Sequence, residues 1–463
     1  MIKLSRWLTA DRRSWRPCAA YVALLVIGAS MPLSVKVAAQ SDVAIVAGPM
    51  PGYVAMRSAR LWLQTNGPAD IAIDYWPVGR PEQAKSTTGH EALAERDFSL
   101  AVSIGDLDPG QTYEYRVRVN GTEQTLPDPL RFRTMPFWQR RSDPPLFTVA
   151  LGSCAYLNDA PYEHLGEEHG GGYEIFETIA RLQPEMMLWL GDNIYLREPD
   201  YDSPEGFAYR YRTQRGAVEL QRLLRATHHV ATWDDHEFGP NNSNRSYRFK
   251  DTALALFQRY WVNPSYGMPD VPGVFTVVNY GDVDFFLLDD RYYRDADEAP
   301  NFAGKSMLGE AQLRWLKNAL LSSPATFKFI VNGSQMLDKQ PGIEGWSNFP
   351  AEKQAFFDWL AESDISGVVL LAGDRHMSKL IKHKRFWHYP LYELTCSPLT
   401  SSPRDPASEP NPEVVEGTYI GERNFCTLNF HGARKDRTLT IRVFSTTGEL
   451  RWEKKLAAKE LRD

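Results

Sequence analysis

Short, continuous apolar runs dominate the sequence after about residue 146, and they constrain the fold more than any other feature. They alternate with amphipathic helical patterns such as "YEIFETIARLQ" and "AQLRWLKNALL". A strand that is buried on both faces of a sheet gives an unbroken apolar run, whereas a strand with one solvated face alternates apolar and polar residues. The pattern predicts an α/β (α+β) domain over residues 146–463, in which helices cover buried strands.

Six of these runs end in polar or ionisable side chains. Examples are "EMMLWLG", which leads into Asp192, and "VVLLAG", which leads into Asp374. In α/β folds, ligands bind beyond the carboxyl ends of the strands. The runs therefore predict one shared site where several strands end. The polar residues that follow them are Ser153 and Cys154; Asp192, Asn193 and Tyr195; Asp234, Asp235, His236 and Glu237; Asp289, Asp290 and Arg291; Asn332 and Gln335; and Asp374, Arg375 and His376.

The residue types at these strand ends indicate metal ions. Carboxylates in one cleft repel one another near neutral pH, and such a cluster is tolerated chiefly when cations lie among them. Carboxylate and amide oxygens suit calcium, magnesium or manganese, whereas thiolate, phenolate and imidazole suit iron or zinc. The mixture predicts at least two ions of different character. The candidate carboxylates are Asp192, Asp235, Asp289 and Asp374, and the softer candidates are Cys154, Tyr195, His236 and His376.

Taken alone, each motif also has a structural interpretation. A single cysteine such as Cys154 is more often a small buried apolar residue, and Asp192 in "GDNIY" could cap backbone donors in a turn. "WDDHE" is harder to explain in this way, because two adjacent aspartates before a histidine gain nothing from an ordinary turn. The histidines without such neighbours are interpreted as structural, namely His228, His229, His383 and His388.

Residues 1–39 have the pattern of a signal peptide. A basic stretch ending at Arg16 precedes an apolar segment that is short for a membrane span, and the small residues of "VAA" suit cleavage after about Ala39. The adjacent Arg12 and Arg13 indicate either twin-arginine export or ordinary charge before the apolar segment. Removal of the segment lowers the formal net charge from −6 to −11. Nucleic-acid-binding proteins usually have a basic surface, so the acidic chain that remains gives no support to nucleic-acid binding.

Residues 40–136 are predicted to form a separate β domain. Short β-rich runs such as "IAIDYWP" and "TYEYRVRVNG" are separated by glycine, proline, asparagine and aspartate, as in a β-sandwich. "LDPGQTYEYRVRV" resembles the end of a fibronectin type III or immunoglobulin-like sandwich. The stretch has no cluster of charged residues or histidines, which favours a structural role. Residues 135–145 have the prolines and charges of a linker.

The chain has four cysteines, and Cys18 leaves with the predicted signal peptide. In an oxidising compartment, two of Cys154, Cys396 and Cys426 pair and one is left over. The count alone does not decide which of the three stays free.

The order of the motifs resembles that of the alkaline phosphatase D family, the PhoD-like branch of the calcineurin-like metallophosphoesterases. The motifs are "GSC", "GDNIY", "WDDHEFGPNN", "LLDDRYYR", "AGDRH" and "YELTCSPL", in unbroken order from about residue 146 to residue 430. The resemblance implies a four-layered metallophosphatase sandwich of two mixed sheets flanked by helices, preceded by an immunoglobulin or fibronectin III-like β-sandwich.

The resemblance also implies a site that holds ferric iron (Fe3+) and calcium (Ca2+), with other divalent cations as alternatives. Cys154 and Tyr195 would bind the iron, and Asp192 would bridge the two metals. His236 would correspond to the catalytic histidine of metallophosphatases. The implied metal ligands are Cys154, Asp192, Tyr195, Asp235, Asn241, Asp374 and His376.

The sequence departs from the family pattern in two places. Asp290 stands where the family often has threonine, and Ala155 follows the cysteine of "GSC". The aspartate adds a negative charge near a site that is expected to bind an anion, so it affects the expected substrate preference and leaves the metal ligands unchanged.

The predicted reaction is metal-assisted hydrolysis of a phosphate ester by an exported, periplasmic or extracellular enzyme. His236 would protonate the leaving alkoxide, and Arg291 or Arg375 would hold a non-bridging oxygen by a forked contact. Arg375 lies between two expected ligands, and the alternative is that it points away and pairs with a carboxylate. A Cys396–Cys426 disulfide is expected, with Cys154 free for metal.

Two other classes of protein compete with a phosphatase. A phosphodiesterase, including a phospholipase D-like hydrolase, would need room for the second organic arm of its substrate. A secreted metal-binding or adhesive protein without turnover would be expected to lack ligands, and none is missing from the sequence. The expected partner is a small phosphate ester or phosphodiester, and no membrane anchor is expected after signal cleavage.

Overall fold

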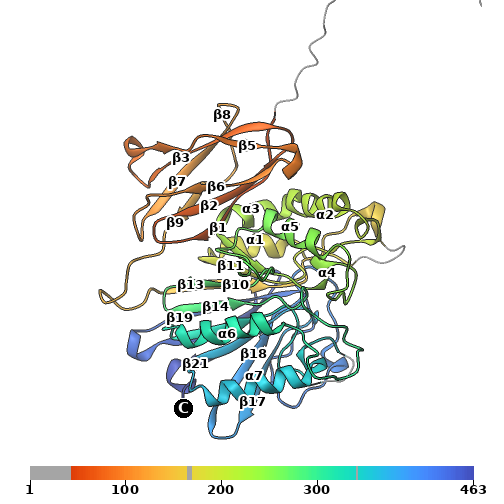
Figure 1. Ribbon diagram of the computed structural model, residues 1–463. Helices are drawn as coiled ribbons and strands as arrows, with labels where there is room; N and C mark the ends of the chain where they lie inside the picture. The colour runs from red at the N-terminus through yellow and green to blue at the C-terminus, as the bar shows by residue number, and fades with distance from the viewer. Residues whose placement is uncertain (1–42, 164–168, 340–342) are drawn as a thin grey trace, which may run out of the picture. The chain divides into compact units, whose positions relative to one another are not determined.

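The computed structural model describes residues 43–163, 169–339 and 343–463 (Figure 1). The expected signal peptide lies outside the described residues. Within the described ranges, no helix is long and apolar enough to cross a membrane.

The described chain begins with two small antiparallel sheets, drawn in red and orange in Figure 1. One has the strand order β1-β2-β6, and the other has the order β4-β3-β7-β8, with β5 paired to β3 and β9 paired to β7. Side chains of β7 alternate in burial, and Tyr115 and Val117 share one apolar core with Leu61 and Leu63 of the facing sheet. The strands are β1 (Ile45–Val54), β2 (Ala59–Thr65), β3 (Ala69–Pro77), β4 (Lys85–Ser86), β5 (His90–Ala92), β6 (Ser99–Ile104), β7 (Thr112–Val119), β8 (Thr122–Glu123) and β9 (Arg131–Arg133).

Two mixed sheets of six strands each follow. The first has the order β12-β11-β10-β19-β20-β21 and the second the order β13-β14-β15-β16-β18-β17. In the first sheet β10, β11 and β12 are parallel, and in the second sheet β14, β15, β16 and β18 are parallel. The strands are β10 (Phe147–Gly152), β11 (Met186–Leu190), β12 (His228–Thr232), β13 (Thr276–Tyr280), β14 (Val283–Leu287), β15 (Phe327–Val331), β16 (Val368–Ala372), β17 (Lys379–Arg385), β18 (His388–Thr395), β19 (Asn424–His431), β20 (Thr438–Ser445) and β21 (Leu450–Ala457).

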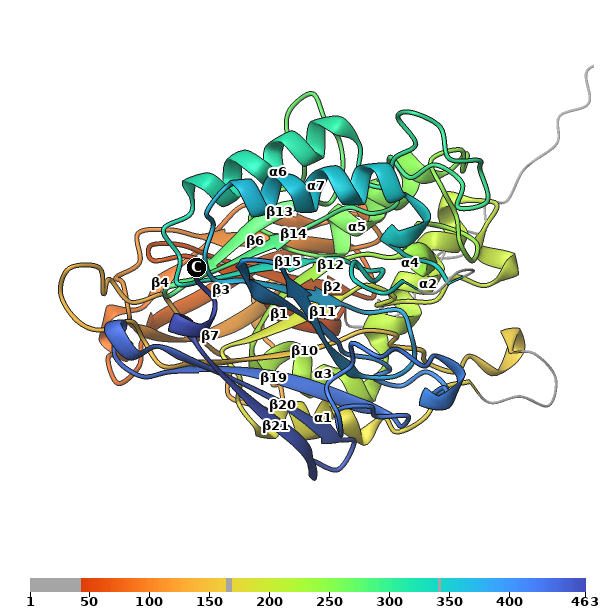
Figure 2. The same ribbon diagram turned by 90° about the horizontal axis from the view of Figure 1, so that it is seen from below.

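Helices cover the outer faces of the two sheets. Figure 2 shows α6 and α7 side by side over the second sheet, and their residues Leu316 and Phe356 belong to the core that both sheets share. On the side of the first sheet, Phe176 of α1, Leu223 of α3 and Phe257 of α5 form a second core. The layers are therefore helix, sheet, sheet and helix. The helices are α1 (Glu174–Arg181), α2 (Pro204–Gly216), α3 (Val218–Ala226), α4 (Asp235–Phe238), α5 (Lys250–Tyr260), α6 (Glu310–Ser322) and α7 (Pro350–Glu362).

Strand β11 explains why the predicted strands have unbroken apolar runs. Its sequence MMLWL is buried at every position. Leu188 and Leu190 belong to the core shared by the two sheets, whereas Met187 and Trp189 belong to the core under the helices of the first sheet. Because successive side chains of a strand point to opposite faces, a strand between two cores needs apolar residues at every position. The prediction of a mixed α/β architecture is confirmed.

The predicted disulfide between Cys396 and Cys426 is confirmed. Cys396 directly follows β18 of the second sheet, and Cys426 lies in β19 of the first sheet, so the bond links the two sheets. Cys154 is the free cysteine among the described residues, and it is buried.

Replacing both cysteines of the disulfide (Cys396→Ala with Cys426→Ala) is expected to lower the free energy of unfolding by about 2–5 kcal/mol, because the cross-link restricts the unfolded chain. Urea unfolding of the oxidised protein, followed by tryptophan fluorescence, measures the change. The wild type reduced by dithiothreitol is the matched comparison, since it lacks the cross-link and keeps the sequence. A double variant as stable as the wild type would show that the disulfide does not stabilise the fold.

Candidate metal centre

The carboxyl ends of parallel strands from both sheets meet closely. A Cβ atom on Gly373, which follows β16, would lie 2.6 Å from the carbonyl oxygen of Leu190 in β11. A Cβ atom on Gly333, which follows β15, would lie 2.6 Å from Cγ of Asp234, which follows β12. Only a residue without a side chain allows backbones to approach so closely. These glycines bring the strand ends of the two sheets together.

Glu237 holds two of the strand-end turns in place. This residue of α4 is fully buried. Its Oε2 accepts hydrogen bonds from the backbone N–H groups of Asp192 (2.9 Å) and Asp234 (3.1 Å), and its Oε1 accepts one from Asn193 (2.5 Å). Burial raises the pKa of Glu237 to about 8, although these backbone donors oppose the shift. The sequence interpretation assigned Glu237 no role. The spacing of Asp234 and Glu237, that of a capping box, was the signal that could have found it.

Asp192, Asp235 and His236 form a group that could hold a metal ion. One ligand atom from each residue lies within 4.8 Å of the others. Burial, and after it the charge of Asp235, raises the pKa of Asp192 well above its ordinary value. A cation between the carboxylates would remove this repulsion. Among the described residues, Nδ1 of His236 is a buried nitrogen without a hydrogen-bond partner. These features fit a bound cation.

A second set of side chains adjoins Asp192 on its other side. Sγ of Cys154 lies 3.6 Å from Oδ2 of Asp192. The hydroxyl of Tyr195 lies 3.3 Å from the same oxygen and 3.2 Å from Nε2 of His376. Burial raises the pKa values of the Cys154 thiol and the Tyr195 phenol, so both groups need a nearby cation to ionise near neutral pH. Asp192 is common to both groups, which is the position that a bridging ligand would have.

His376 is oriented with one ring nitrogen toward the centre. Its Nδ1 lies 2.7 Å from the carbonyl oxygen of Ser402. A carbonyl only accepts hydrogen bonds, so Nδ1 carries the proton and Nε2 presents its lone pair toward Tyr195. Metal-binding histidines are commonly fixed by such a contact.

Four of the predicted ligands have left-handed backbone conformations, with φ of 58° at Cys154, 51° at Asp192, 65° at Asp374 and 55° at His376. Residues other than glycine rarely adopt this region, and they do so mostly where the surrounding structure and function require it. Hydrogen bonds hold the conformations here. The N–H of His376 donates to Oγ of Ser397 (3.0 Å), and its carbonyl accepts from the N–H of Arg404 (2.8 Å).

Two residues of the sequence prediction lie away from these groups. The carboxylate of Asp289 is fully buried and accepts hydrogen bonds from Nε1 of Trp233 (2.9 Å) and the N–H of Val274 (2.9 Å). It therefore supports the local fold and does not face the other carboxylates. Asn241 is exposed, and it is the N–H of its neighbour Asn242 that contacts Oδ2 of Asp235 (2.7 Å).

The two predicted substrate-binding arginines are paired with carboxylates. The side chain of Arg291 is fully buried; its Nε donates to Oδ1 of Asp234 (2.6 Å), and its Nη1 pairs with Glu344. Nε of Arg375 lies 3.1 Å and 3.2 Å from the two carboxylate oxygens of Glu409, and its Nη1 donates to Oδ2 of Asp374 (3.3 Å). Of the two alternatives that the sequence left open for Arg375, the structure has the pairing with a carboxylate.

A cavity of about 370 Å³ opens onto the centre. Its lining includes Tyr195, His236 and His376, together with Tyr156, Tyr201 and Arg404. Arg404 is exposed, and in the described part of the chain its guanidinium forms no ion pair and no hydrogen bond. A larger cavity of about 660 Å³ lies elsewhere, between α7 and the β17–β18 hairpin, and contains none of the predicted ligands.

Comparison with protein families gives two matches. The family model described as PhoD-like phosphatase matches residues 149–435, and a model described as a domain of unknown function (DUF7800) matches residues 42–136. Alkaline phosphatase D of Bacillus subtilis (strain 168) is 25% identical to the chain over 351 residues. The match covers 64% of this chain and 55% of that relative, so it spans little more than half of the relative's length.

Two solved structures share the fold. A structure of PhoD superposes with a TM-score of 0.70 at 18% identity and covers 88% of each chain. The purple acid phosphatase PPD1 from yellow lupin seeds superposes with a TM-score of 0.62 at 10% identity, over 88% of this chain and 74% of that one. At these identities the similarity extends to the fold alone, a mixed α/β arrangement of several sheets.

Glu237→Gln is expected to weaken binding of a divalent cation to metal-stripped protein by about 10- to 100-fold. The amide would place a donor where a carboxylate oxygen now accepts from the backbone, so the turns that carry Asp192 and Asp234 would shift. Calorimetric titration with Ca2+ or Mn2+ measures the affinity. Glu219→Gln, an exposed glutamate of α3, serves as the control. Unchanged affinity in Glu237→Gln would rule out the positioning role of Glu237.

Proposed function

Because the chain belongs to the PhoD-like phosphatase family, we propose that it is a metal-dependent hydrolase of phosphate esters. The observation that carries the proposal is the buried pair of ligand groups that share Asp192. A carboxylate common to two potential cation sites is what a two-metal phosphatase needs to hold both ions against one phosphoryl group. Alkaline phosphatase D, the name of the Bacillus relative, supports a phosphomonoester as the substrate.

We assign the softer site to ferric iron and the harder site to calcium. Cys154, Tyr195 and His376 would hold the iron, because thiolate, phenolate and imidazole suit it. Asp235 and Asp374 would hold the calcium, with Asn241 as a further ligand if its turn closes on the ion. Asp192 would contact both ions. Bound cations supply a hydroxide nucleophile from water at working pH and neutralise charge on the phosphoryl oxygens.

Of the group Asp192, Asp235 and His236, the two carboxylates are assigned to the metal ions, and His236 is proposed as the general acid and not as a metal ligand. It lines the open cavity and lies close to Asp192 and Asp235. From there its ring would give a proton to the oxygen of the leaving alkoxide, and it would take back a proton from water after the product leaves. Proton transfer by a positioned side chain accelerates such a step by about 10²- to 10⁴-fold.

The proposed roles of the arginines follow from their partners. Arg291 and Arg375 would act through the carboxylates that they hold, Asp234 and Asp374, and are assigned as positioning residues. Arg404 is the better candidate to contact the substrate, since it lines the same cavity as His236 and His376 and forms no ion pair among the described residues. A guanidinium matches two oxygens of a phosphate group at once.

A phosphodiesterase is the second candidate function. The cavity is lined by Tyr156, Leu196 and Tyr201 as well as by charged groups. These apolar and aromatic surfaces would accommodate the second organic arm of a diester, which a monoester does not have. Turnover of a phosphomonoester measured beside turnover of a phosphodiester decides between the two candidate functions.

The domain limits and the location also belong to the proposal. We propose a signal peptide at residues 1–39, an immunoglobulin or fibronectin III-like structural domain at 40–136 and a phosphatase domain at 146–463. Export to the periplasm or the exterior agrees with the Cys396–Cys426 disulfide, because disulfides persist in oxidising compartments.

The metal-loaded protein is expected to hydrolyse p-nitrophenyl phosphate, with bis-p-nitrophenyl phosphate as the diester test. Removal of metal by a chelator should abolish turnover, and re-addition should restore it. Absence of turnover of both substrates by protein of measured metal content would refute the proposed function.

His236→Ala is expected to lower kcat by about 10²- to 10⁴-fold, with the loss smaller for substrates whose leaving group needs no proton. His431→Gln, on the exposed end of β19, is the control for this variant.

Arg404→Gln is expected to raise KM for the preferred substrate and to change kcat less. A KM of Arg404→Gln equal to that of the wild type would exclude the substrate contact.

A further inference from the structure

The tip of the β17–β18 hairpin exposes two adjacent aromatic side chains. Phe386 is 87% exposed and Trp387 is 90% exposed, the largest exposed fractions among the large apolar side chains of the described residues. Their ring centroids lie 6.1 Å apart. Single exposed apolar residues are common on protein surfaces, but an aromatic pair at the end of a projecting hairpin indicates a surface that is covered by a partner.

The same hairpin carries positive charge. In the described part of the chain, Lys382, Lys384 and Arg385 form no ion pair. His383 and His388 are different, because each lies within reach of a carboxylate, of Glu413 at 2.9 Å and Asp463 at 2.7 Å respectively. The whole chain has a formal charge of −6. The hairpin is therefore a local cationic surface on an acidic protein.

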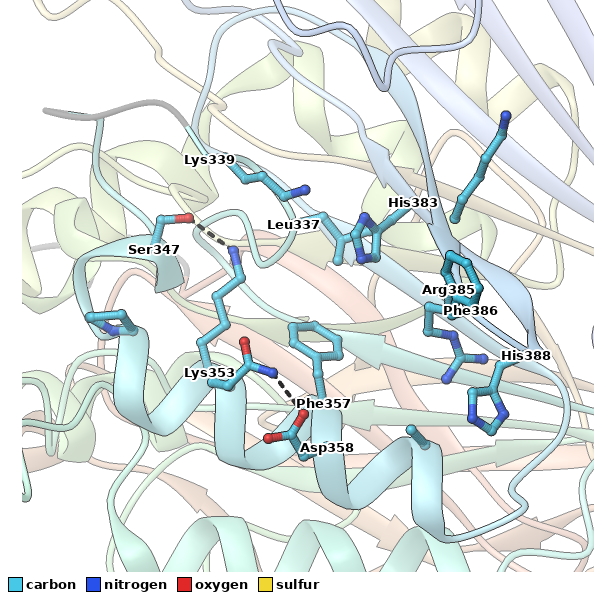
Figure 3. A pocket seen from close by; sticks show the side chains of 14 residues that line it. Leu337, Lys339, Ser347, Lys353, Phe357, Asp358, His383, Arg385, Phe386 and His388 are labelled. Atoms are coloured by element: carbon cyan, nitrogen blue, oxygen red, sulfur yellow. Dashed lines mark hydrogen bonds between the residues drawn. The ribbon is translucent and has the colours of Figure 1, made fainter.

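A cavity of about 660 Å³ lies directly beside this tip, between the hairpin and α7. Figure 3 shows Lys339, Phe357 and His383 gathered in the space between the helix and the hairpin. Lys353 also lines the cavity, where its Nζ donates to Oγ of Ser347 (2.9 Å) and to the carbonyl oxygen of Asp338 (3.2 Å). Asp358 also lines the cavity and accepts a hydrogen bond from Nε2 of Gln354 (2.7 Å), and Nζ of Lys339 pairs with Glu413 (3.0 Å). Among the described residues Lys353 forms no ion pair, so its amine and the ring of Phe357 are the groups that suit a ligand with an anionic end and an apolar end.

We propose that the β17–β18 hairpin binds the surface of an anionic phospholipid bilayer, with Phe386 and Trp387 inserted at the interface and one lipid phosphate in the adjacent cavity. Aromatic side chains of this type concentrate at the level of lipid headgroups. Unpaired lysine and arginine residues are attracted to anionic lipids. Stable attachment to a bilayer takes two such signals, and the hairpin supplies both.

The proposed surface is separate from the metal centre. Strand β17 begins three residues after His376, and its residues lead away from the site toward Phe386. At about 3.3 Å per residue, the tip lies roughly 20 Å from the start of the strand. Attachment through the tip would leave the cavity at the metal centre accessible, so binding to lipid and turnover of a soluble substrate can be measured independently.

Vesicle co-sedimentation tests the proposal. The protein is expected to bind vesicles of phosphatidylcholine with phosphatidylglycerol at low salt, to be released as the salt concentration rises, and to bind vesicles of phosphatidylcholine alone at least about tenfold more weakly. Equal binding to both vesicles, or to neither, would overturn the proposal.

Two pairs of substitutions separate the apolar and the charged contributions. Phe386→Ser with Trp387→Ser, and separately Lys384→Gln with Arg385→Gln, should each weaken binding to the anionic vesicles by about tenfold or more. The controls are Val218→Ser, at an exposed valine of α3, and Arg80→Gln with Lys85→Gln, at exposed residues of the β-sandwich. Turnover of p-nitrophenyl phosphate should be unchanged in all four variants.

The outcomes separate this proposal from its alternatives. Tip variants that bind vesicles as well as the controls would exclude the hairpin as the attachment point. A tip variant that changes a dimer into a monomer in light scattering, with no vesicle binding by the wild type, would identify the surface as a contact between two copies of the chain and overturn the lipid proposal. Vesicle binding by protein without phosphatase activity would refute the proposed function and leave the lipid surface supported.

Discussion

The carboxylate of Glu237 is the contact on which the candidate centre depends. It accepts hydrogen bonds from the backbone of two turns, one after β11 and one after β12. A buried carboxylate is costly unless hydrogen bonds satisfy it, and these three donors do so. With the turns fixed to one side chain, Asp192 and Asp235 have little freedom to move apart, despite their mutual repulsion.

The charges around the centre are balanced in two layers. Arg291 pairs with Asp234 and Glu344, and Arg375 pairs with Glu409 and with Asp374. These arginines offset part of the negative charge around the centre. Asp235 lies 4.0 Å from a guanidinium nitrogen of Arg291, whereas Asp192 has no ion pair with an arginine among the described residues. Asp192, the carboxylate common to both ligand groups, is therefore the least compensated by arginine.

The strands, and the presence of polar residues at their carboxyl ends, were predictable because both depend on the local sequence pattern. A segment such as β11 is apolar at every position, since it separates two cores, and the polar residues after it mark the end of a strand. The directions of the side chains beyond the strands were not predictable. Asp289 and Asp235 both follow apolar runs, yet one turns into the fold and the other toward the centre. The partners that decide this, such as Glu344 for Arg291 and Glu409 for Arg375, are distant in the sequence. Asn241 was expected from family resemblance alone, and its turn lies exposed.

The left-handed backbone at Cys154, Asp192, Asp374 and His376 extends the candidate centre beyond the residues that would bind ions. Residues other than glycine rarely adopt this region, so neighbouring groups must hold the conformation. At His376 the N–H donates to Oγ of Ser397, and the carbonyl accepts from the N–H of Arg404. Loss of such a neighbour would let the backbone relax and turn the ligand side chain away, so residues that would touch no ion still set the geometry of the ligands.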